Sequence, residues 1–286
     1  SSLSLKASRG GVYMAYKKIL TVQDISCVGQ CSLTVALPII SACGIETCVL
    51  PSAVLSTHTA GFKGYTFRDL TEDMPDIAKH WAKEKIVFDC VYTGYLGSKQ
   101  QIAYVEDIYR TTRKDGSLLI VDPAMADHGR RYSGLSEEYA RAMESLCRRA
   151  DIIMPNMTEA AMFAGREYRE AMTEEYVSEL LDALDHPCVI LTGTGYQPGM
   201  TGVTIREKGA QFLYTHAKLG KNYHGTGDMF AACFTGALLC GRSKTEAAQI
   251  AADFVCKAIE KTMNNPAHWY GVKFEQALPD LIRKLQ

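Results

Sequence analysis

Short, β-branched apolar runs alternate with longer helical patterns along most of this chain, and this alternation constrains the fold more than any other feature. Strands are expected at residues 18–23, 46–52, 86–92, 117–122, 151–155 and 188–193. Between them, apolar spacing and capping residues predict helices at residues 31–44, 98–116, 136–150 and 173–185, with Gly116 ending the second of these. The alternation predicts an α/β fold in which helices cover both faces of a mainly parallel sheet.

The pattern changes after residue 200, where residues 201–207 and 210–217 resemble a β-hairpin and two long helices then finish the chain. Pro38 lies inside the first expected helix, where we expect a kink. No repeat or interdomain linker is evident, so residues 18–286 are expected to form a single domain. Residues 1–17 lack helical periodicity and a continuous apolar stretch, and we expect them to be an expression-derived or disordered leader.

Charge and composition argue against several kinds of partner. The net charge of the 286 residues is −1, so the chain has no excess of basic side chains with which to bind nucleic acid or an anionic membrane. The longest apolar run, residues 229–241, is too short to cross a bilayer. The ten cysteines include no C-x-x-C pair and lie mostly in apolar segments, which is typical of a reduced, cytoplasmic protein.

Polar and glycine-rich segments follow the expected strands. They are Asp24 and residues 56–62, 93–98, 122–129, 156–160 and 193–196. In an open parallel sheet, ligands bind beyond the carboxyl ends of the strands. These segments are therefore expected to converge on one rim and to form a binding site there.

The segment "HGTGDMF", residues 224–230, joins a glycine-containing loop to an apolar helix. A helix that begins near Asp228 would present free backbone N–H groups from about Gly225 onward, and Gly225 and Gly227 would let an anion approach closely. Asp228 could equally be a simple helix cap. Because the following helix is expected to be buried, we favour a carboxylate that takes a proton from an alcohol beside an anion site, which is the chemistry of phosphoryl transfer to a hydroxyl.

The motifs of two other classes of phosphoryl-transfer protein, the P-loop proteins and the protein kinases, are absent from the sequence. The sequence contains no G-x-x-x-x-G-K-[ST] segment and no H-R-D or D-F-G set. It does contain, in this order, "STHTAGF" (56–62), "TGY" (93–95), "VDPAMAD" (121–127), "PNMTEA" (155–160) and "GTGD" (225–228). In these segments the chain resembles the ribokinase-like superfamily and, within it, the pyridoxal kinase branch, from about Lys18 to the C-terminus.

The resemblance implies a three-layer α/β/α sandwich and a kinase that uses ATP and Mg²⁺ to phosphorylate the 5′-hydroxymethyl group of a B6 vitamer. It also implies a general base, Asp228, and an anion hole formed by Gly225, Thr226 and Gly227. The positions that match the metal and nucleotide contacts of the branch are Asp127 and Glu159 on the metal side, and Asp122, Asn156, Thr192 and Gly193 on the nucleotide side. From the residues alone, Asp122 could instead belong to a strand-end turn, and Glu159 could be a first-turn helix charge.

On the substrate side, Thr59 and Tyr95 match ring contacts of the branch, and His58 is a further candidate. The chain departs from the branch at Asp24, where serine is usual. An anionic Asp24 would pair with a protonated pyridine nitrogen and would alter the preference among vitamers. The second departure is Met154, which stands where the branch commonly has threonine. The monovalent-cation site that the branch has near the nucleotide would therefore lack this threonine.

Three alternative functions stay open. Hydroxymethylpyrimidine is a similar heteroaromatic alcohol, and its kinases share the "GTGD" ending. A sugar or nucleoside kinase is disfavoured, because residues 56–62 and 93–98 suit a planar ring. A non-catalytic regulator that binds a B6 vitamer or a nucleotide is the third alternative. The resemblance also implies a homodimer, since members of the branch are commonly dimers.

Overall fold

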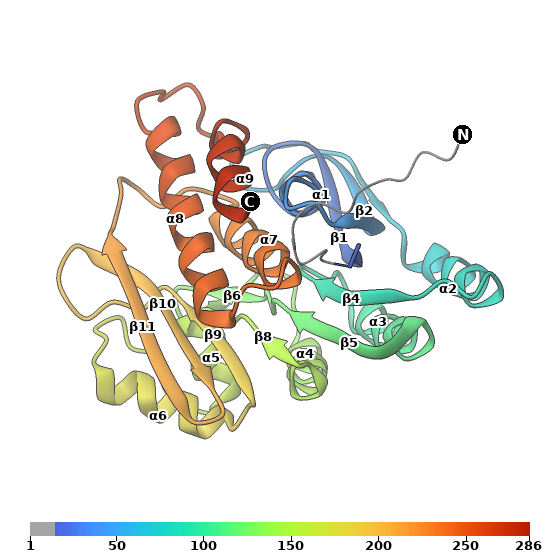
Figure 1. Ribbon diagram of the computed structural model, residues 1–286, viewed down its shortest axis with the longest axis horizontal. Helices are drawn as coiled ribbons and strands as arrows, with labels where there is room; N and C mark the ends of the chain where they lie inside the picture. Colours follow the sequence, from blue (N-terminus) through green and yellow to red (C-terminus); the bar gives the residue numbers. More distant parts are fainter. Residues whose placement is uncertain (1–14) are drawn as a thin grey trace, which may run out of the picture.

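One large sheet organises the protein in this computed structural model, which describes residues 15–286 (Figure 1). Its strands, in spatial order, are β11 (Ala210–Ala217), β10 (Met200–Glu207), β9 (Cys188–Thr192), β8 (Ile152–Ile153), β5 (Arg113–Val121), β4 (Phe88–Thr93), β1 (Lys18–Val28), β2 (Glu46–Thr57) and β3 (Phe67–Asp69). The six strands from β9 to β2 are parallel, and the other three are antiparallel. The predicted α/β architecture is confirmed.

Helices cover both faces of this sheet and complete the three layers (Figure 1). One face carries α1 (Leu33–Ala42), α7 (Thr226–Leu239), α8 (Lys244–Thr262) and α9 (Leu278–Leu285). The other carries α2 (Met74–Lys83), α3 (Lys99–Thr112), α4 (Glu137–Arg149), α5 (Met157–Phe163) and α6 (Glu174–Leu184). Within residues 15–286, no helix combines the length and the apolar character needed to cross a membrane.

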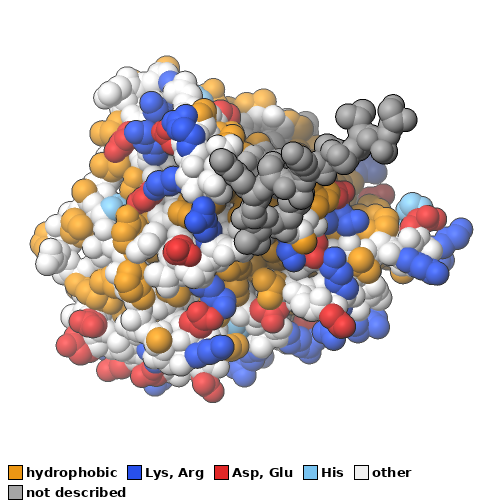
Figure 2. Space-filling model, in the orientation of Figure 1, with side chains coloured by type: hydrophobic (Ala, Val, Ile, Leu, Met, Phe, Trp, Pro, Cys, Tyr) orange, Lys and Arg blue, Asp and Glu red, His pale blue; other side chains and the backbone are white. Residues whose placement is uncertain are grey.

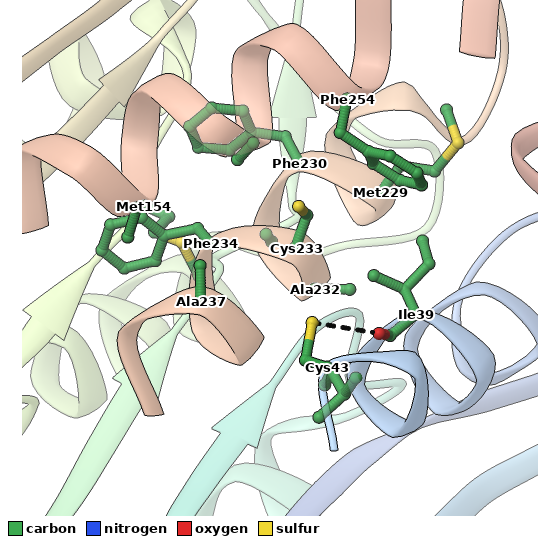
Figure 3. Close-up of a cluster of buried hydrophobic side chains, with 14 of the residues drawn as sticks. Ile39, Cys43, Met154, Met229, Phe230, Ala232, Cys233, Phe234, Ala237 and Phe254 are labelled. Atoms are coloured by element: carbon green, nitrogen blue, oxygen red, sulfur yellow. Dashed lines mark hydrogen bonds between the residues drawn. The ribbon is translucent and has the colours of Figure 1, made fainter. Parts of the chain in front are cut away.

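Helix α7 lies at the centre of its layer, in contact with α1 and α8. This helix is buried on nearly every side, and most of its side chains are small. Figure 3 shows Phe230, Cys233 and Phe234 of α7 within the cluster of buried side chains. At Gly236, an added Cβ would lie 2.5 Å from Cys43 Sγ, so only glycine permits this approach of α7 to α1. The core therefore fixes the position of the N-terminus of α7.

Several expected boundaries were wrong. Helix α3 ends at Thr112, and Gly116, with φ of 81°, lies inside β5 and does not end the helix. Short elements were also missed, namely β3, α2 and a two-residue hairpin formed by β6 (Ala126–Asp127) and β7 (Arg130–Arg131). These elements bury too few side chains to give a periodic apolar pattern: in α2 only Met74 is buried.

Asp24 was expected in a loop after the first strand, and this placement was wrong. It lies within β1, at an irregularity where the register with β2 shifts between Gln23 and Ile25. The extra residue at this irregularity lies on β2, so β1 continues through Asp24, which is buried with 8% exposure. The hairpin of β10 and β11 is confirmed, and the expected leader lies outside the described residues except for residues 15–17.

The surface is mixed in charge. Figure 2 shows Lys and Arg side chains interspersed with Asp and Glu over the visible face, in keeping with the net charge of −1.

Candidate active site

The N-terminus of α7 has the backbone geometry that an anion site requires. Gly225 precedes the helix with φ of 84°, and an added Cβ there would lie 2.1 Å from the main-chain oxygen of Gln30. The first helical hydrogen bond runs from the Met229 N–H to the Gly225 carbonyl, at 3.0 Å. The N–H groups of residues 225–228 have no protein acceptor within the part of the chain that the structure describes. They therefore remain available to a ligand at the positive end of the helix dipole.

Asp228, in the first turn of this helix, faces a cavity of about 630 Å³. One of its oxygens, Oδ2, accepts the Ser32 N–H at 2.9 Å. Burial raises the pKa of this carboxyl to about 6, and the nearby charge of Asp24 raises it further, against the lowering effect of the Ser32 hydrogen bond. The group is thus ionised near neutral pH but holds a proton more strongly than an ordinary aspartate. This is the property that a general base needs.

The cavity extends from Asp228 across the carboxyl ends of β5, β8 and β9. Its walls come from residues 122–132, the start of α5, the ends of β9 to β11, residues 218–228 and α8. Its volume lies within the usual range of small-molecule sites. A second hollow of about 660 Å³, between α8 and α9, contains none of the expected site residues, and we do not assign the chemistry to it.

Asp122 lies at the end of β5, on the wall of the cavity. Burial raises the pKa of its carboxyl well above the usual value, and the charges of Glu159 and Asp228 raise it further. The Ala124 N–H opposes these effects. Asp122, Glu159 and Asp228 thus all line the cavity, and the charges of the latter two disfavour ionisation of Asp122.

Glu159 has a structural role that sequence reasoning had left open. Its Oε1 accepts the N–H groups of Met125 and Ala126 at 2.8 and 3.3 Å, and its Oε2 accepts the Asn156 N–H at 3.0 Å. The Asn156 side chain accepts the Glu159 N–H at 2.9 Å, which completes a capping box at the start of α5. Burial raises the pKa of Glu159 to about 7. Asp127, in contrast, is exposed.

Asn156, Thr192 and Gly193 also line the cavity, with Asn156 directly beside Glu159. Asn156 and Thr192 form a parallel bridge, and the Asn156 amide donates to the Ala126 carbonyl at 2.7 Å. Gly193 has φ of 77° and donates its N–H to the Gly202 carbonyl at 2.9 Å. The fold therefore brings together all the residues expected on the metal and nucleotide sides.

The four residues expected on the substrate side do not line this cavity. Asp24 accepts the Ser32 hydroxyl at 2.8 Å and the Ser26 hydroxyl at 3.4 Å. Burial raises the pKa of the Tyr95 hydroxyl, and so does the charge of Asp24. Tyr95 is half-buried, and Thr59 is exposed on the loop after β2.

His58 uses both ring nitrogens in contacts with the main chain. Its Nε2 lies 2.6 Å from the Tyr270 carbonyl, and its Nδ1 accepts the Ala60 N–H at 3.1 Å. The ring is thus the Nε2–H tautomer. Its proposed contact with the substrate would have to use the ring face, because the nitrogens already have partners.

Sequence reasoning missed Ser32, Lys218, Lys221 and His224. Lys218 and Lys221 line the same cavity from the loop before α7. The ring centroids of His224 and His58 lie 4.4 Å apart, and partial burial of the His224 ring lowers its pKa to about 4. The two lysines just before "HGTGD" were a visible signal, whereas Ser32 gave none, since its role depends on contacts distant in sequence.

Comparisons with known proteins agree with this geometry. The family model described as phosphomethylpyrimidine kinase matches residues 38–272. A hydroxymethylpyrimidine/phosphomethylpyrimidine kinase of Bacillus subtilis is 31% identical over 219 residues, which are 74% of this chain and 78% of that protein.

Solved structures are also similar. A Bacteroides thetaiotaomicron structure described as a phosphomethylpyrimidine kinase, with pyridoxal, is 37% identical, with a TM-score of 0.87 over 93% of this chain and 96% of that one. The pyridoxal kinase of Lactobacillus plantarum is 29% identical, with a TM-score of 0.87 over 94% and 97%. These findings confirm the ribokinase-like fold and the pyridoxal kinase branch. The chain belongs to the phosphomethylpyrimidine kinase family and is a phosphotransferase with an alcohol group as acceptor.

Proposed function

We propose that this kinase transfers the γ-phosphoryl group of ATP to the 5′-hydroxymethyl group of a B6 vitamer. The observation that carries the proposal is the placement of Asp228, which faces the cavity beside the N–H groups of residues 225–228, for which residues 15–286 provide no acceptor. A hydroxyl held there would give its proton to Asp228, and the amides would stabilise the charge on the transferred group.

The nucleotide is proposed to occupy the cavity walls that Asn156, Thr192 and Gly193 form. Lys218 and Lys221 supply positive charge on the same cavity, which suits a triphosphate. Asp228 then lies at the end of the cavity, where the acceptor hydroxyl must meet the γ-phosphate for in-line transfer.

The acidic side of the cavity fits Mg²⁺ bound mainly by phosphate and water. Asp122 is a buried carboxyl whose raised pKa reflects two further acidic neighbours, so a cation would relieve its repulsion. Within residues 15–286, however, no group of three or more His, Cys, Asp or Glu side chains is arranged to hold a metal ion. Asp122 and Asp127 would therefore hold Mg²⁺ through water, and the ion would neutralise charge on the phosphates. Glu159 contributes through its hold on residues 125 and 126.

A B6 vitamer is preferred because the Bacteroides structure contains pyridoxal and because Asp24 and Tyr95 offer a carboxylate and an aromatic ring to a pyridine. Hydroxymethylpyrimidine is the second candidate, because the Bacillus subtilis relative is named for that substrate. The cytoplasm, a homodimer and a monovalent cation remain predictions for this chain. All ten cysteines are free, which is consistent with a reducing compartment.

The test is a phosphorylation assay with ATP and Mg²⁺ on pyridoxal, pyridoxamine, pyridoxine and hydroxymethylpyrimidine. We expect the highest kcat/KM on one of the three vitamers. A kcat/KM at least tenfold higher on hydroxymethylpyrimidine would replace the B6 assignment with the second candidate. Binding of ATP and pyridoxal by calorimetry with no turnover of any alcohol would indicate a regulator instead.

A further inference from the structure

Ser32 is held in a strained conformation between two carboxylates. Its φ and ψ are 50° and −130°, a region that residues with a Cβ rarely adopt. Serine at a helix N-cap usually accepts a backbone N–H of the first turn, but the Ser32 side chain makes no such bond at the start of α1. A strained backbone conformation and an N-cap side chain that makes no capping bond persist only where contacts with neighbouring residues stabilise them.

The surroundings impose them through two hydrogen bonds. The Ser32 N–H donates to Asp228 Oδ2 at 2.9 Å, and the Ser32 hydroxyl donates to Asp24 Oδ1 at 2.8 Å. Ser32 is 6% exposed and Asp24 is 8% exposed, so water competes little for these bonds. Asp228 lies on α7 and Asp24 on β1, so Ser32 directly joins two elements that are distant in sequence.

We propose that Ser32 is a positioning residue that fixes the distance between the base and the ring-binding carboxylate. The inference rests on the proposed function, because it assigns Asp228 to the acceptor hydroxyl and Asp24 to the heteroaromatic nitrogen. One residue then orients both ends of the substrate: its main chain orients the base, and its side chain orients Asp24. The left-handed backbone is what lets the N–H and the hydroxyl point to different partners at once.

The first variant is Ser32→Ala, which keeps the N–H to Asp228 and removes the hydroxyl from Asp24. Since a hydrogen bond to a charged group is involved, we expect KM for the vitamer to rise about tenfold, with kcat changed less than about threefold and KM for ATP unchanged. Ser32→Gly also frees the backbone, so the N–H to Asp228 is held less firmly. We expect it to show the same rise in KM and, in addition, a roughly tenfold lower kcat.

Ser136→Ala is the matched control, because Ser136 is an exposed N-cap that does accept a first-turn N–H, from Tyr139 at 3.1 Å. Loss of this capping hydrogen bond should lower the melting temperature by about 3 °C and leave kcat and KM for the vitamer unchanged. If Ser32 were only a cap, Ser32→Gly would behave like the wild type, since glycine is tolerated at N-caps.

A double-mutant cycle with Asp24→Ser completes the test. If Ser32 acts through Asp24, adding Ser32→Ala to Asp24→Ser should change KM for the vitamer less than about twofold. A full tenfold rise in that background, or an unchanged KM in the single variant, would overturn the inference while leaving the kinase assignment intact. A wild-type enzyme that phosphorylates none of the four alcohols would overturn both.

Discussion

Replacing Asp228 with asparagine should make the protein more stable and nearly inactive. The burial that raises the pKa of this carboxyl from 3.8 to about 6 means that the folded protein resists its ionisation. A difference of about two pH units corresponds to about 3 kcal/mol. Because one side of the group faces the cavity, where solvent screens it, we expect about 1–2 kcal/mol in practice. Asparagine removes this penalty and can still accept the Ser32 N–H.

The sign of the pH dependence follows from linkage. The stability that the protonated carboxyl contributes is complete below pH 3.8 and is lost as the pH rises through about 6. Asparagine does not titrate, so its advantage over aspartate should grow as the pH rises from about 4 through about 6, and it should level off above about pH 7.

The measurement is thermal and urea unfolding of ligand-free wild type and Asp228→Asn at several pH values from about pH 4 to about pH 8, together with kcat at pH 8. We expect the variant to gain about 3–6 °C in melting temperature at pH 8 and to lose about 10²–10⁴ in kcat. Wild-type kcat should rise with pH through about 6. Asp127→Asn, which replaces an exposed carboxylate of the same cavity, should leave stability unchanged. An Asp228→Asn variant that is less stable than wild type at pH 8, or that keeps normal turnover, would refute the reasoning.

Two further predictions concern the glycines of the anion site and the capping box. Gly225→Ala should destabilise the protein by at least about 2 kcal/mol, because its Cβ would collide with the Gln30 main-chain oxygen and its φ is 84°. Gly227→Ala has no such contact, so it should keep its melting temperature yet lose turnover if phosphate approaches there; normal turnover would argue against that approach. Glu159→Gln should cost about 1–3 kcal/mol in urea unfolding, since one carboxylate oxygen becomes an NH₂ that faces an N–H donor. An unchanged unfolding midpoint would contradict the role of the capping box.

Much of the fold could be predicted because its strands are buried on both faces and give continuous apolar runs. The rim could be predicted for the same reason, since parallel strands all end on one side of the sheet. The sequence motifs also singled out Asp228, Asn156, Thr192 and Gly193, which the structure places on one cavity, and their roles there stay predictions.

The rest depended on contacts that no local pattern records. The burial of Asp24 within β1 and the strained φ of Ser32 are set by neighbours far away in the chain. Gly116 was misjudged because a glycine with positive φ suits a helix end as well as an irregular strand start. Glu159 matched a motif, yet only the structure shows that it holds two segments together.

The burial of α7 has a consequence for substrate selectivity. The helix cannot shift without reopening the core around Gly236, so the phosphate-transferring half of the site has a single geometry. The proposed ring contacts include Thr59, which is exposed on the loop after β2 and can be exchanged without disturbing that core. Discrimination between one heteroaromatic alcohol and another can therefore be redesigned in this loop while the catalytic rate is preserved.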